Sequence, residues 1–362
     1  MKQLLFFSSD FKIGLSQLLT DQLISLDRAG VPYIAIAGEG EQEDGLGGTL
    51  RDKGIQLIRV KGLDLHANFM RLVREVSNII VERKVEIVHV QNNWQLAIVS
   101  TARLKILAKR RFKIVYTLHG FRHNSPIKAF IARGVIGSAL FLFADHVICM
   151  TEYLKRKFRF LSYKIEMIPL GVKDDYFEND FIPPSTASLR LIFPAQFRHG
   201  KNQDMVIRAF AEYVDRTKDR KSTLVLPGKG ELLDDMQRLA SSLGVGEQVE
   251  FPGFISKQQI KQEYLNSNIA IVASNSETFG QSIVEPFVLG RCVISTPVGV
   301  ATEIIHNDVT GYVYNSEQNL VDVLMDLAIH REKLKTIGRE NFNRRSMFSW
   351  KSVTARYIKA LL

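Results

Sequence analysis

Cysteine is scarce in this sequence of 362 residues: the two present, Cys149 and Cys292, both lie inside apolar, strand-like runs. So few thiols argue against a disulfide-stabilised fold, and we interpret both as free, buried side chains in a reducing compartment. No apolar run approaches the roughly 18 residues that a membrane-spanning helix needs. The first residues carry one lysine and four consecutive apolar residues, too short a run for the core of a signal peptide. We therefore expect a cytoplasmic protein.

Disorder is also excluded, because 46% of the residues are hydrophobic and 24% are charged. The chain is longer than one hydrophobic core usually spans, so we expect two domains. In each half, short apolar runs alternate with amphipathic segments of helical length, which is typical of right-handed β-α-β units and parallel sheets. The predicted class is α/β, with two Rossmann-like domains whose parallel sheets face each other across a cleft.

The alternation predicts individual elements. Strands are expected at 4–8, 33–37, 56–60, 87–90, 113–118, 146–150, 189–194, 223–226, 249–251, 269–273 and 293–295. Helices are expected near 15–29, 69–83, 95–108, 127–143, 203–216, 231–243, 257–266, 281–289 and 320–327.

Domain boundaries are predicted from the segment 172–188, which is polar, lacks a period and carries two adjacent prolines. We interpret it as a linker between an N-terminal domain, 1–171, and a C-terminal domain, 189–345. The last residues, 346–362, have the pattern of an amphipathic helix, and we expect this helix to pack back toward the N-terminal domain.

The most informative segment is S-N-S-E-T-F-G-Q-S-I-V-E-P-F-V-L-G, residues 274–290, which follows a predicted strand and begins a helix. Gly280 allows the backbone to approach a ligand more closely than a side chain would permit. The amides of Phe279, Gly280, Gln281 and Ser282 then lie at a helix N-terminus, where the helix dipole favours an anion such as a diphosphate.

Two glutamates, Glu277 and Glu285, flank this turn. Carboxylates beside an anion site suit neutral hydroxyls, such as those of a sugar and a ribose. For each residue alone a structural interpretation stays open: Glu285 can support the helix dipole, and Glu277 can be a solvated loop residue.

This segment resembles the E-x7-E motif of glycosyltransferase family 4, whose members have the two-domain GT-B fold and retain the anomeric configuration. The resemblance extends over 227–253 and 296–313 and covers nearly all of the C-terminal half. In the family the second glutamate binds the nucleotide ribose and the first contacts the donor sugar. The resemblance therefore implies these roles for Glu285 and Glu277.

The resemblance also implies that Phe254 and Ile255, which follow the strand V-E-F-P-G, contact the base through their backbone. A second site is predicted in P-A-Q-F-R-H-G-K-N, where Arg198 and Lys201 follow a strand end. Two cations there can neutralise a leaving diphosphate. The family commonly has arginine where this chain has Gln196, although some lipid-linked mannosyltransferases resemble Q-F-R-x-x-K. A solvated helix start is the alternative for both cations.

The N-terminal half resembles the family more weakly. V-Y-T-L-H-G is similar to the strand that ends in a histidine facing the donor sugar, which implies that role for His119. The segment I-P-L-G-V resembles the I-P-N-G-V that precedes the linker. The first loop lacks the usual paired glycines, and Gly14 is the best match for donor contact. We interpret His89 and Trp94 as structural residues.

Positive charge is concentrated in one window of the sequence. The chain has a net charge of +10, and residues 101–164 alone hold 14 basic residues and two acidic ones. We expect an anionic partner there, and an anionic bilayer suits basic residues interleaved with aromatic ones. No nucleic-acid-binding signature is present. A solvated basic face is the alternative. The two clusters are Arg103, Lys105, Lys109, Arg110, Arg111 and Lys113, and then Lys155, Arg156, Lys157 and Arg159, with Phe158 and Phe160 expected to enter the interface.

Together with these patterns, the resemblance implies a retaining hexosyltransferase that uses a nucleoside-diphosphate sugar, most simply a UDP-sugar. The implied acceptor is a lipid-linked glycan in O-antigen or lipopolysaccharide assembly, at the inner face of the cytoplasmic membrane. Because no Asp-x-Asp motif occurs, we expect neither a metal nor a cofactor. A UDP-sugar epimerase or phosphorylase of the same architecture and a catalytically silent membrane adaptor are the alternatives. The E-x7-E motif argues against the epimerase, and a phosphorylase would need a lysine-bound cofactor and usually a far longer chain. Intact Glu277, Glu285 and Lys201 argue against the silent adaptor.

Overall fold

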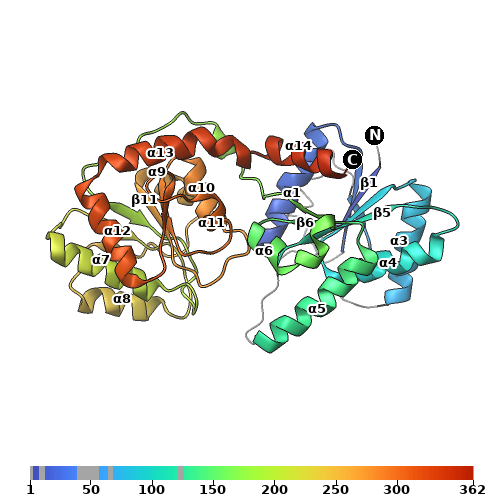
Figure 1. Cartoon of the computed structure of the whole chain (residues 1–362), viewed down its shortest axis with the longest axis horizontal. Helices are drawn as coiled ribbons and strands as arrows, with labels where there is room; N and C mark the ends of the chain where they lie inside the picture. Colours follow the sequence, from blue (N-terminus) through green and yellow to red (C-terminus); the bar gives the residue numbers. More distant parts are fainter. Residues whose placement is uncertain (1–2, 8–12, 39–56, 64–67, 121–125, 362) are drawn as a thin grey trace. The chain divides into compact units, whose positions relative to one another are not determined.

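The computed structural model describes residues 3–7, 13–38, 57–63, 68–120 and 126–361. The chain forms two compact units: Met1–Gly171 with Trp350–Leu362, and Val172–Ser349. Each unit is a parallel sheet with helices packed on it (Figure 1).

The first unit contains a seven-stranded sheet in the order β3-β2-β1-β4-β5-β6-β7. Its strands are β1 (Leu4–Phe7), β2 (Tyr33–Ala37), β3 (Leu57–Arg59), β4 (Ile87–Val90), β5 (Lys113–Leu118), β6 (His146–Cys149) and β7 (Ile165–Met167). The helices are α1 (Ile13–Arg28), α3 (Phe69–Glu82), α4 (Asn93–Ile106), α5 (Pro126–Phe143), α6 (Glu152–Lys157) and α14 (Trp350–Leu361), with a 3-10 turn η1 (Arg159–Lys164).

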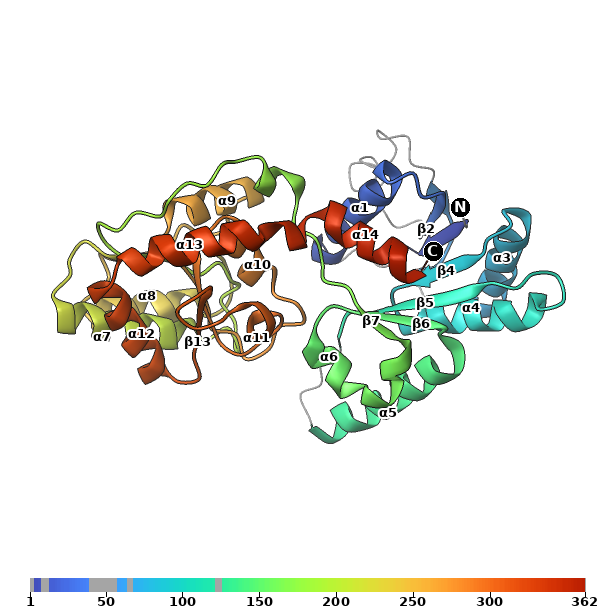
Figure 2. The same ribbon diagram turned by 45° about the horizontal axis from the view of Figure 1, so that its top comes forward.

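Alternation along the strands gives this sheet two apolar faces. In β1, Leu5 and Phe7 belong to the core shared with α3 and α4, whereas Leu4 and Phe6 belong to the core shared with α1 and α14. Successive strand residues point to opposite faces, so a fully apolar strand is buried on both. Figure 2 shows α14 alongside α1.

The second unit contains a six-stranded sheet in the order β10-β9-β8-β11-β12-β13. Its strands are β8 (Arg190–Ile192), β9 (Thr223–Val225), β10 (Val249–Glu250), β11 (Ile269–Val272), β12 (Cys292–Ser295) and β13 (Gly311–Val313). The helices are α7 (Gln203–Thr217), α8 (Leu233–Ser242), α9 (Lys257–Asn266), α10 (Gln281–Val288), α11 (Ala301–Ile304), α12 (Glu317–Ile329) and α13 (Glu332–Arg344), with 3-10 turns η2 (Asp174–Phe177) and η3 (Arg345–Phe348).

Both sheets have the doubly wound strand order, and every pair of neighbouring strands is parallel. The order reverses between β1 and β4 in the first sheet and between β8 and β11 in the second. In such sheets ligands bind outside the carboxyl ends of the strands at this switch point. The predicted α/β class with two Rossmann-like domains is confirmed.

Five of the described strands and α-helices were not among the expected elements: β7, β13, α6, α11 and α13. The two strands are three residues long, too short for an apolar run to stand out. Helix α13 is largely polar and buries few residues, among them Leu334 and Ile337. Its Gly338 packs against the Gly290 carbonyl at the end of α10, where a side chain would collide with the backbone.

Helix α14 completes the first unit although it follows the second in the sequence. The Ser25 hydroxyl donates to the Trp350 carbonyl at 3.2 Å and lies 2.7 Å from the Thr354 hydroxyl. The Trp350 ring lies against Gly171, where a side chain would collide with it.

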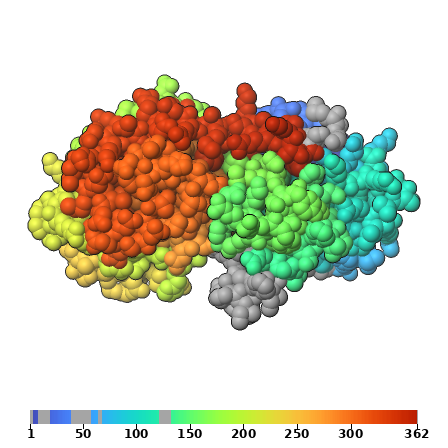
Figure 3. All heavy atoms as spheres, in the orientation of Figure 1, coloured from blue at the N-terminus to red at the C-terminus, as the bar shows by residue number. Residues whose placement is uncertain are grey.

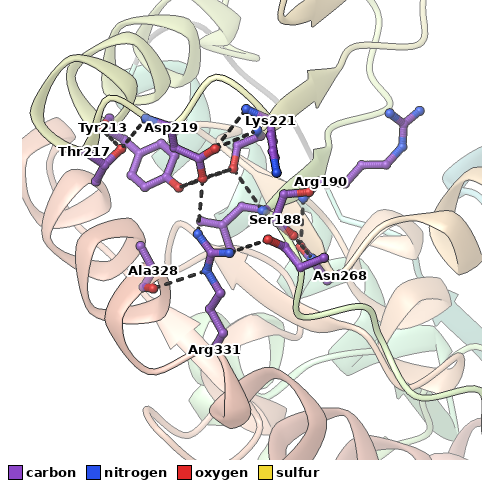
Figure 4. A network of polar contacts seen from close by, with 12 residues as sticks. Ser188, Arg190, Tyr213, Thr217, Asp219, Lys221, Asn268, Ala328 and Arg331 are labelled. Carbon is purple, nitrogen blue, oxygen red and sulfur yellow. Dashed lines mark hydrogen bonds and ion pairs between the residues drawn. The ribbon is translucent and has the colours of Figure 1, made fainter.

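A polar network around Asp219 links three segments of the second unit (Figure 4). The Asp219 carboxylate accepts from the hydroxyls of Ser222 at 2.7 Å and Tyr213 at 2.8 Å, and from Arg331 at 3.2 Å. Arg331 also donates to the carbonyl of Ala187, at the end of the 172–188 segment. Although burial raises the pKa of Asp219, the hydrogen bonds outweigh it and leave the pKa below its usual value. Buried acceptors satisfied in this way fix the surrounding segments.

Candidate active site

Two loops meet where β8 and β11 end, at the switch point of the second sheet. The Lys201 ammonium donates to the Glu277 carboxylate at 2.5 Å and to the Ser274 hydroxyl at 3.1 Å. The side chains of Lys201 and Glu277 are 16% and 15% exposed, so water screens this ion pair little. Asn202, in the left-handed conformation at φ 56°, donates to the Ala273 carbonyl at 2.7 Å and holds the loops together.

Close backbone packing brings further loops to this edge. Gly228, with φ 157°, lies against the Ala195 carbonyl, and Gly299, with φ 54°, lies against the Phe279 carbonyl. A Cβ atom at either position would collide with backbone, so only glycine fits. The amide of Ala195 donates to the Pro227 carbonyl at 3.0 Å. The loops after β8, β9, β11 and β12 therefore form one polar rim at the carboxyl edge.

The N-terminus of α10 supplies the amides that the sequence predicted. Gly280 precedes the helix at φ 95°, and no side chain caps it. Within the described part of the chain, the amides of Phe279, Gly280, Gln281 and Ser282 have no hydrogen-bond acceptor. The buried Gln281 side-chain nitrogen also lacks a partner there. Unpaired donors at a helix N-terminus suit an anionic ligand.

Glu285 lies in the same helix and is only partly exposed to solvent. Burial raises the pKa of its carboxyl to about 7; Lys257 and Lys173 oppose the shift, and Asp175 adds to it. No hydrogen bond or ion pair reaches this carboxylate from the residues that the structure describes. A partly buried carboxyl with a raised pKa beside unpaired backbone amides is typical of ligand-binding positions.

The other predicted residues of this unit lie at the same edge without joining the ion pair. Arg198 is partly exposed and follows β8 in the turn that leads to Lys201. Phe254 is 74% exposed and Ile255 is partly buried, both just after Gly253. The Lys229 ammonium lies 5.2 Å from the Phe254 ring centroid, a cation that the sequence analysis missed. Its position between Gly228 and Gly230 is the signal that could have identified it.

In the first unit, His119 follows β5 and Gln91 follows β4, the neighbouring strand. The Nε2 atom of His119 lies 2.6 Å from the Gln91 side-chain oxygen. Burial lowers the pKa of His119 to about 4, so the ring is neutral at pH 7. Gly14 lies in the first turn of α1, and the loop before it lies outside the described residues.

Three of the residues that were expected to face a membrane have other surroundings in the structure. Phe158 is fully buried and cannot enter a membrane interface, whereas Phe160 is 56% exposed. Phe158 lies one helical turn after the buried Leu154, so both face the core. Arg103 pairs with Asp145 at 2.7 Å, and Arg110 donates to backbone carbonyls, so both are structural. In the described ranges, no helix is long and apolar enough to cross a membrane.

Among known proteins, the chain is similar to alpha-monoglucosyldiacylglycerol synthase of Streptococcus pneumoniae, with 24% identity over 297 residues, 72% of this chain and 65% of that protein. It is 22% identical over 289 residues to a subunit of phosphatidylinositol N-acetylglucosaminyltransferase of Schizosaccharomyces pombe, covering 77% of this chain and 61% of that protein. The chain thus spans slightly less than two thirds of the length of these curated relatives.

Solved structures share the fold over whole chains. Anabaena HepE in complex with UDP-glucose superposes with a TM-score of 0.75 at 18% identity, covering 99% of both chains. The lipopolysaccharide outer core galactosyltransferase WaaB in its apo form superposes with a TM-score of 0.75 at 16% identity, also covering 99% of both chains.

Two family models match consecutive parts of the sequence. The one described as "Glycosyltransferase Family 4" matches residues 14–176, and the one described as "Glycosyl transferases group 1" matches residues 178–344. Since the two matches extend through both units, the chain belongs to glycosyltransferase family 4, group 1, and has the GT-B fold.

Proposed function

We propose that this protein is a retaining glycosyltransferase that moves a hexose from a nucleoside-diphosphate sugar, most simply a UDP-hexose, to a lipid-linked glycan. The observation that carries the proposal is the Lys201–Glu277 ion pair directly before the uncapped N-terminus of α10. A diphosphate bound there would meet free amides and an ammonium group. The Glu277 carboxylate, released from Lys201, would accept from a hydroxyl of the sugar.

In this transfer the bond between the anomeric carbon and the diphosphate oxygen breaks, the acceptor hydroxyl oxygen bonds to the same face of that carbon, and the hydroxyl proton passes to the leaving diphosphate. Negative charge then grows on the leaving diphosphate. Lys201, Arg198 and the amides near Gly280 would stabilise that charge. Glu285 would bind the ribose hydroxyls, and the neutral ring of His119 would bind the donor sugar without adding charge.

The choice of donor and acceptor rests on the relatives. HepE is described as a complex with UDP-glucose, which supports a UDP-sugar. The synthase from Streptococcus pneumoniae and WaaB are named for a glycolipid and for lipopolysaccharide, which supports a lipid-linked acceptor in surface polysaccharide assembly. A silent adaptor or an epimerase would leave a nucleotide-sugar intact or only change its stereochemistry. Slow release of free hexose and UDP by the purified protein would separate a transferase from both.

Activity is expected to persist in excess EDTA, because Lys201, Arg198 and the α10 amides can stabilise the leaving diphosphate. The measurement is release of the nucleoside diphosphate, UDP or GDP, from a panel of UDP- and GDP-hexoses, with and without chelator. Turnover that disappears in EDTA and returns with manganese or magnesium would refute the metal-independent mechanism. Release of no nucleotide from any donor would contradict the transferase itself.

Replacing Glu285 by alanine is expected to weaken binding of UDP-glucose by roughly 10- to 100-fold, because a hydrogen bond from a ribose hydroxyl to a charged carboxylate is lost. In the parent, affinity should rise by up to about tenfold between pH 6 and pH 8, because the carboxyl, with a pKa of about 7, is ionised only at the higher pH. Glu285→Gln should remove this dependence. Calorimetric titration measures both effects.

The matched control for Glu285 is Glu247→Ala, which removes an exposed acidic side chain from the same unit. It should leave the affinity and its pH dependence as in the parent. If Glu285→Ala binds UDP-glucose as tightly as Glu247→Ala does, the ribose assignment is wrong.

We further propose that the first unit docks on anionic lipid through a basic surface on α5, α6 and η1. Two adjacent grooves are lined by basic side chains of these elements: Arg133, Lys155, Arg156, Lys157 and Arg159. Beside them lie exposed apolar side chains, namely Val135, Phe141, Leu142, Tyr153, Phe160 and Tyr163. Figure 3 shows this part of the chain, in green, as one continuous surface of the first unit. Cations next to exposed aromatic rings suit the headgroup region of an anionic bilayer.

A further inference from the structure

A chain of hydrogen bonds runs through the first unit from α14 to the end of β5. The Tyr357 hydroxyl lies 2.8 Å from Nδ1 of His89, and Nε2 of His89 lies 2.6 Å from the Thr117 hydroxyl. The Gln91 side-chain nitrogen lies 3.4 Å from the same Nε2 atom, and its oxygen lies 2.6 Å from Nε2 of His119. Tyr357, His89, Gln91 and Thr117 are buried. A cavity of about 20 Å³ is bordered by Tyr357, Gln91, Thr117 and His119.

With the Gln91 amide oriented as in the structure, the donors and acceptors in this chain favour one arrangement of protons. The Gln91 oxygen can only accept, so Nε2 of His119 carries a proton and donates it. The Gln91 nitrogen can only donate, so it favours an unprotonated Nε2 on His89, whose single lone pair lies 2.6 Å from the Thr117 hydroxyl oxygen and 3.4 Å from this nitrogen. His89 therefore carries its proton on Nδ1 and donates it to the Tyr357 oxygen.

Burial excludes a second proton on either ring. It lowers the pKa of His89 to about 3, with a further contribution from His119, and the pKa of His119 to about 4. Both imidazoles are neutral at pH 7, and the tautomer of each is set by its hydrogen-bond partners.

We propose that Tyr357 is a positioning residue: through His89 and Gln91 it holds His119 as the Nε2–H tautomer and leaves Nδ1 as a hydrogen-bond acceptor. The unprotonated Nδ1 can accept a hydrogen bond from a hydroxyl of a bound sugar. The importance of this tautomer for transfer rests on the proposed function, whereas the tautomer itself does not. Within the described ranges Tyr357 makes no hydrogen bond to a residue assigned to the donor, so we expect it to act through the chain.

The packing of α14 determines where the Tyr357 hydroxyl lies. Trp350, Val353, Tyr357 and Leu361 form the buried face of this helix and pack into the core that contains Leu4 and Phe6. The contacts of Ser25 with Trp350 and Thr354 fix the helix along its axis. Because His89 stacks edge-on against Phe6 at 4.6 Å, its ring cannot turn away from Tyr357 without disturbing that core.

Nitrogen NMR of protein labelled with ¹⁵N-histidine tests the inference without substrate. Each of the variants His119→Gln and His89→Gln removes one set of ring-nitrogen signals. The missing set identifies that ring among the eight histidines of the chain. In the parent we expect the proton on Nε2 of His119 and on Nδ1 of His89. Tyr357→Phe should change His89 toward a tautomeric mixture and shift the His119 signals.

Tyr33→Phe is the matched control, because the buried Tyr33 hydroxyl has no hydrogen-bond partner among the described residues. It should leave both histidine spectra unchanged. Tyr357→Phe should also lower kcat for transfer by roughly tenfold through loss of orientation, while the Kd for UDP, which lacks the sugar, stays as in the parent.

A second variant, Gln91→Met, breaks the link next to His119 and leaves α14 intact. It should produce a tautomeric mixture at His119 with little change at the Tyr357 end. If thermal unfolding shows that both variants are folded, and neither variant changes the His119 tautomer, the inference is overturned. If the tautomer changes and kcat does not, the hydrogen-bond chain is real and the role of His119 in transfer is wrong.

Discussion

Replacing Lys201 by methionine is expected to lower kcat by about 10²- to 10³-fold, the usual loss when one group that stabilises transition-state charge is removed. The Lys201 side chain is only 16% exposed, so water screens its interaction with a diphosphate weakly. Nucleotide affinity should fall less than kcat, because charge on the diphosphate grows as the glycosidic bond breaks. Steady-state kinetics with UDP-glucose, alongside the Kd for UDP, separates the two effects.

Controls for Lys201 must distinguish lost catalysis from lost structure. The variant also leaves the buried Glu277 carboxylate without its partner, so a double variant with Glu277→Gln isolates the missing cation. Lys333→Met removes a lysine paired with Asp308 and Asp326 in the same unit and should retain full activity. A Lys201→Met protein that keeps more than about a third of the parent kcat would contradict the assignment.

Reversing Lys155, Arg156, Lys157 and Arg159 to glutamate is expected to abolish binding to anionic vesicles. Each basic residue near such a surface contributes on the order of 1 kcal/mol, so losing four attractions weakens binding by about 10³-fold before repulsion is counted. Because surface charges act within about 10 Å at 0.1 M salt, binding by the parent should weaken as salt rises. Sedimentation with vesicles of phosphatidylglycerol and phosphatidylcholine measures the effect.

The docking control uses the opposite face of the same sheet. Lys351, Arg356 and Lys359 are exposed on α14, which packs on the other side of the sheet from the α5–α6 surface, and their reversal should leave vesicle binding intact. The first variant should slow transfer to a lipid-linked acceptor and leave transfer to a short soluble analogue nearly unchanged. If the charge-reversed variant sediments with anionic vesicles as much as the parent does, the four basic residues do not bind lipid and form only a solvated surface.

The sequence was most informative where local chemistry and chain geometry coincide. Helix α10 was predicted within one residue because Gly280 and Gly290, both with positive φ, mark its ends. Lys201 and Glu277 follow different strands, and their sequence separation says nothing of distance. The sequence analysis placed them in two sites, and they meet because both strands end at the same edge of a parallel sheet.

Other features depend on tertiary neighbours and left no local pattern. Phe158 belongs to an aromatic and basic stretch that reads as an amphipathic surface, yet its position one turn after Leu154 places it in the core. The link between Gln91 and His119 exists because β4 and β5 are adjacent strands. The raised pKa of Glu285 arises from burial, with Asp175 adding to it against the opposing charges of Lys257 and Lys173, and the motif contains none of these residues.

The place of α14 in the fold has a consequence for synthesis on the ribosome. The first unit lacks its last helix until the residues beyond Ser349 have been translated, by which time all of Val172–Ser349 has been made. At typical rates the intervening residues take roughly 10–40 s to translate. During this interval the sheet face with Leu4 and Phe6 stays partly uncovered, whereas the second unit has every element it needs to fold. The nascent chain is therefore expected to finish its second half first, with its first half open to chaperones until the end.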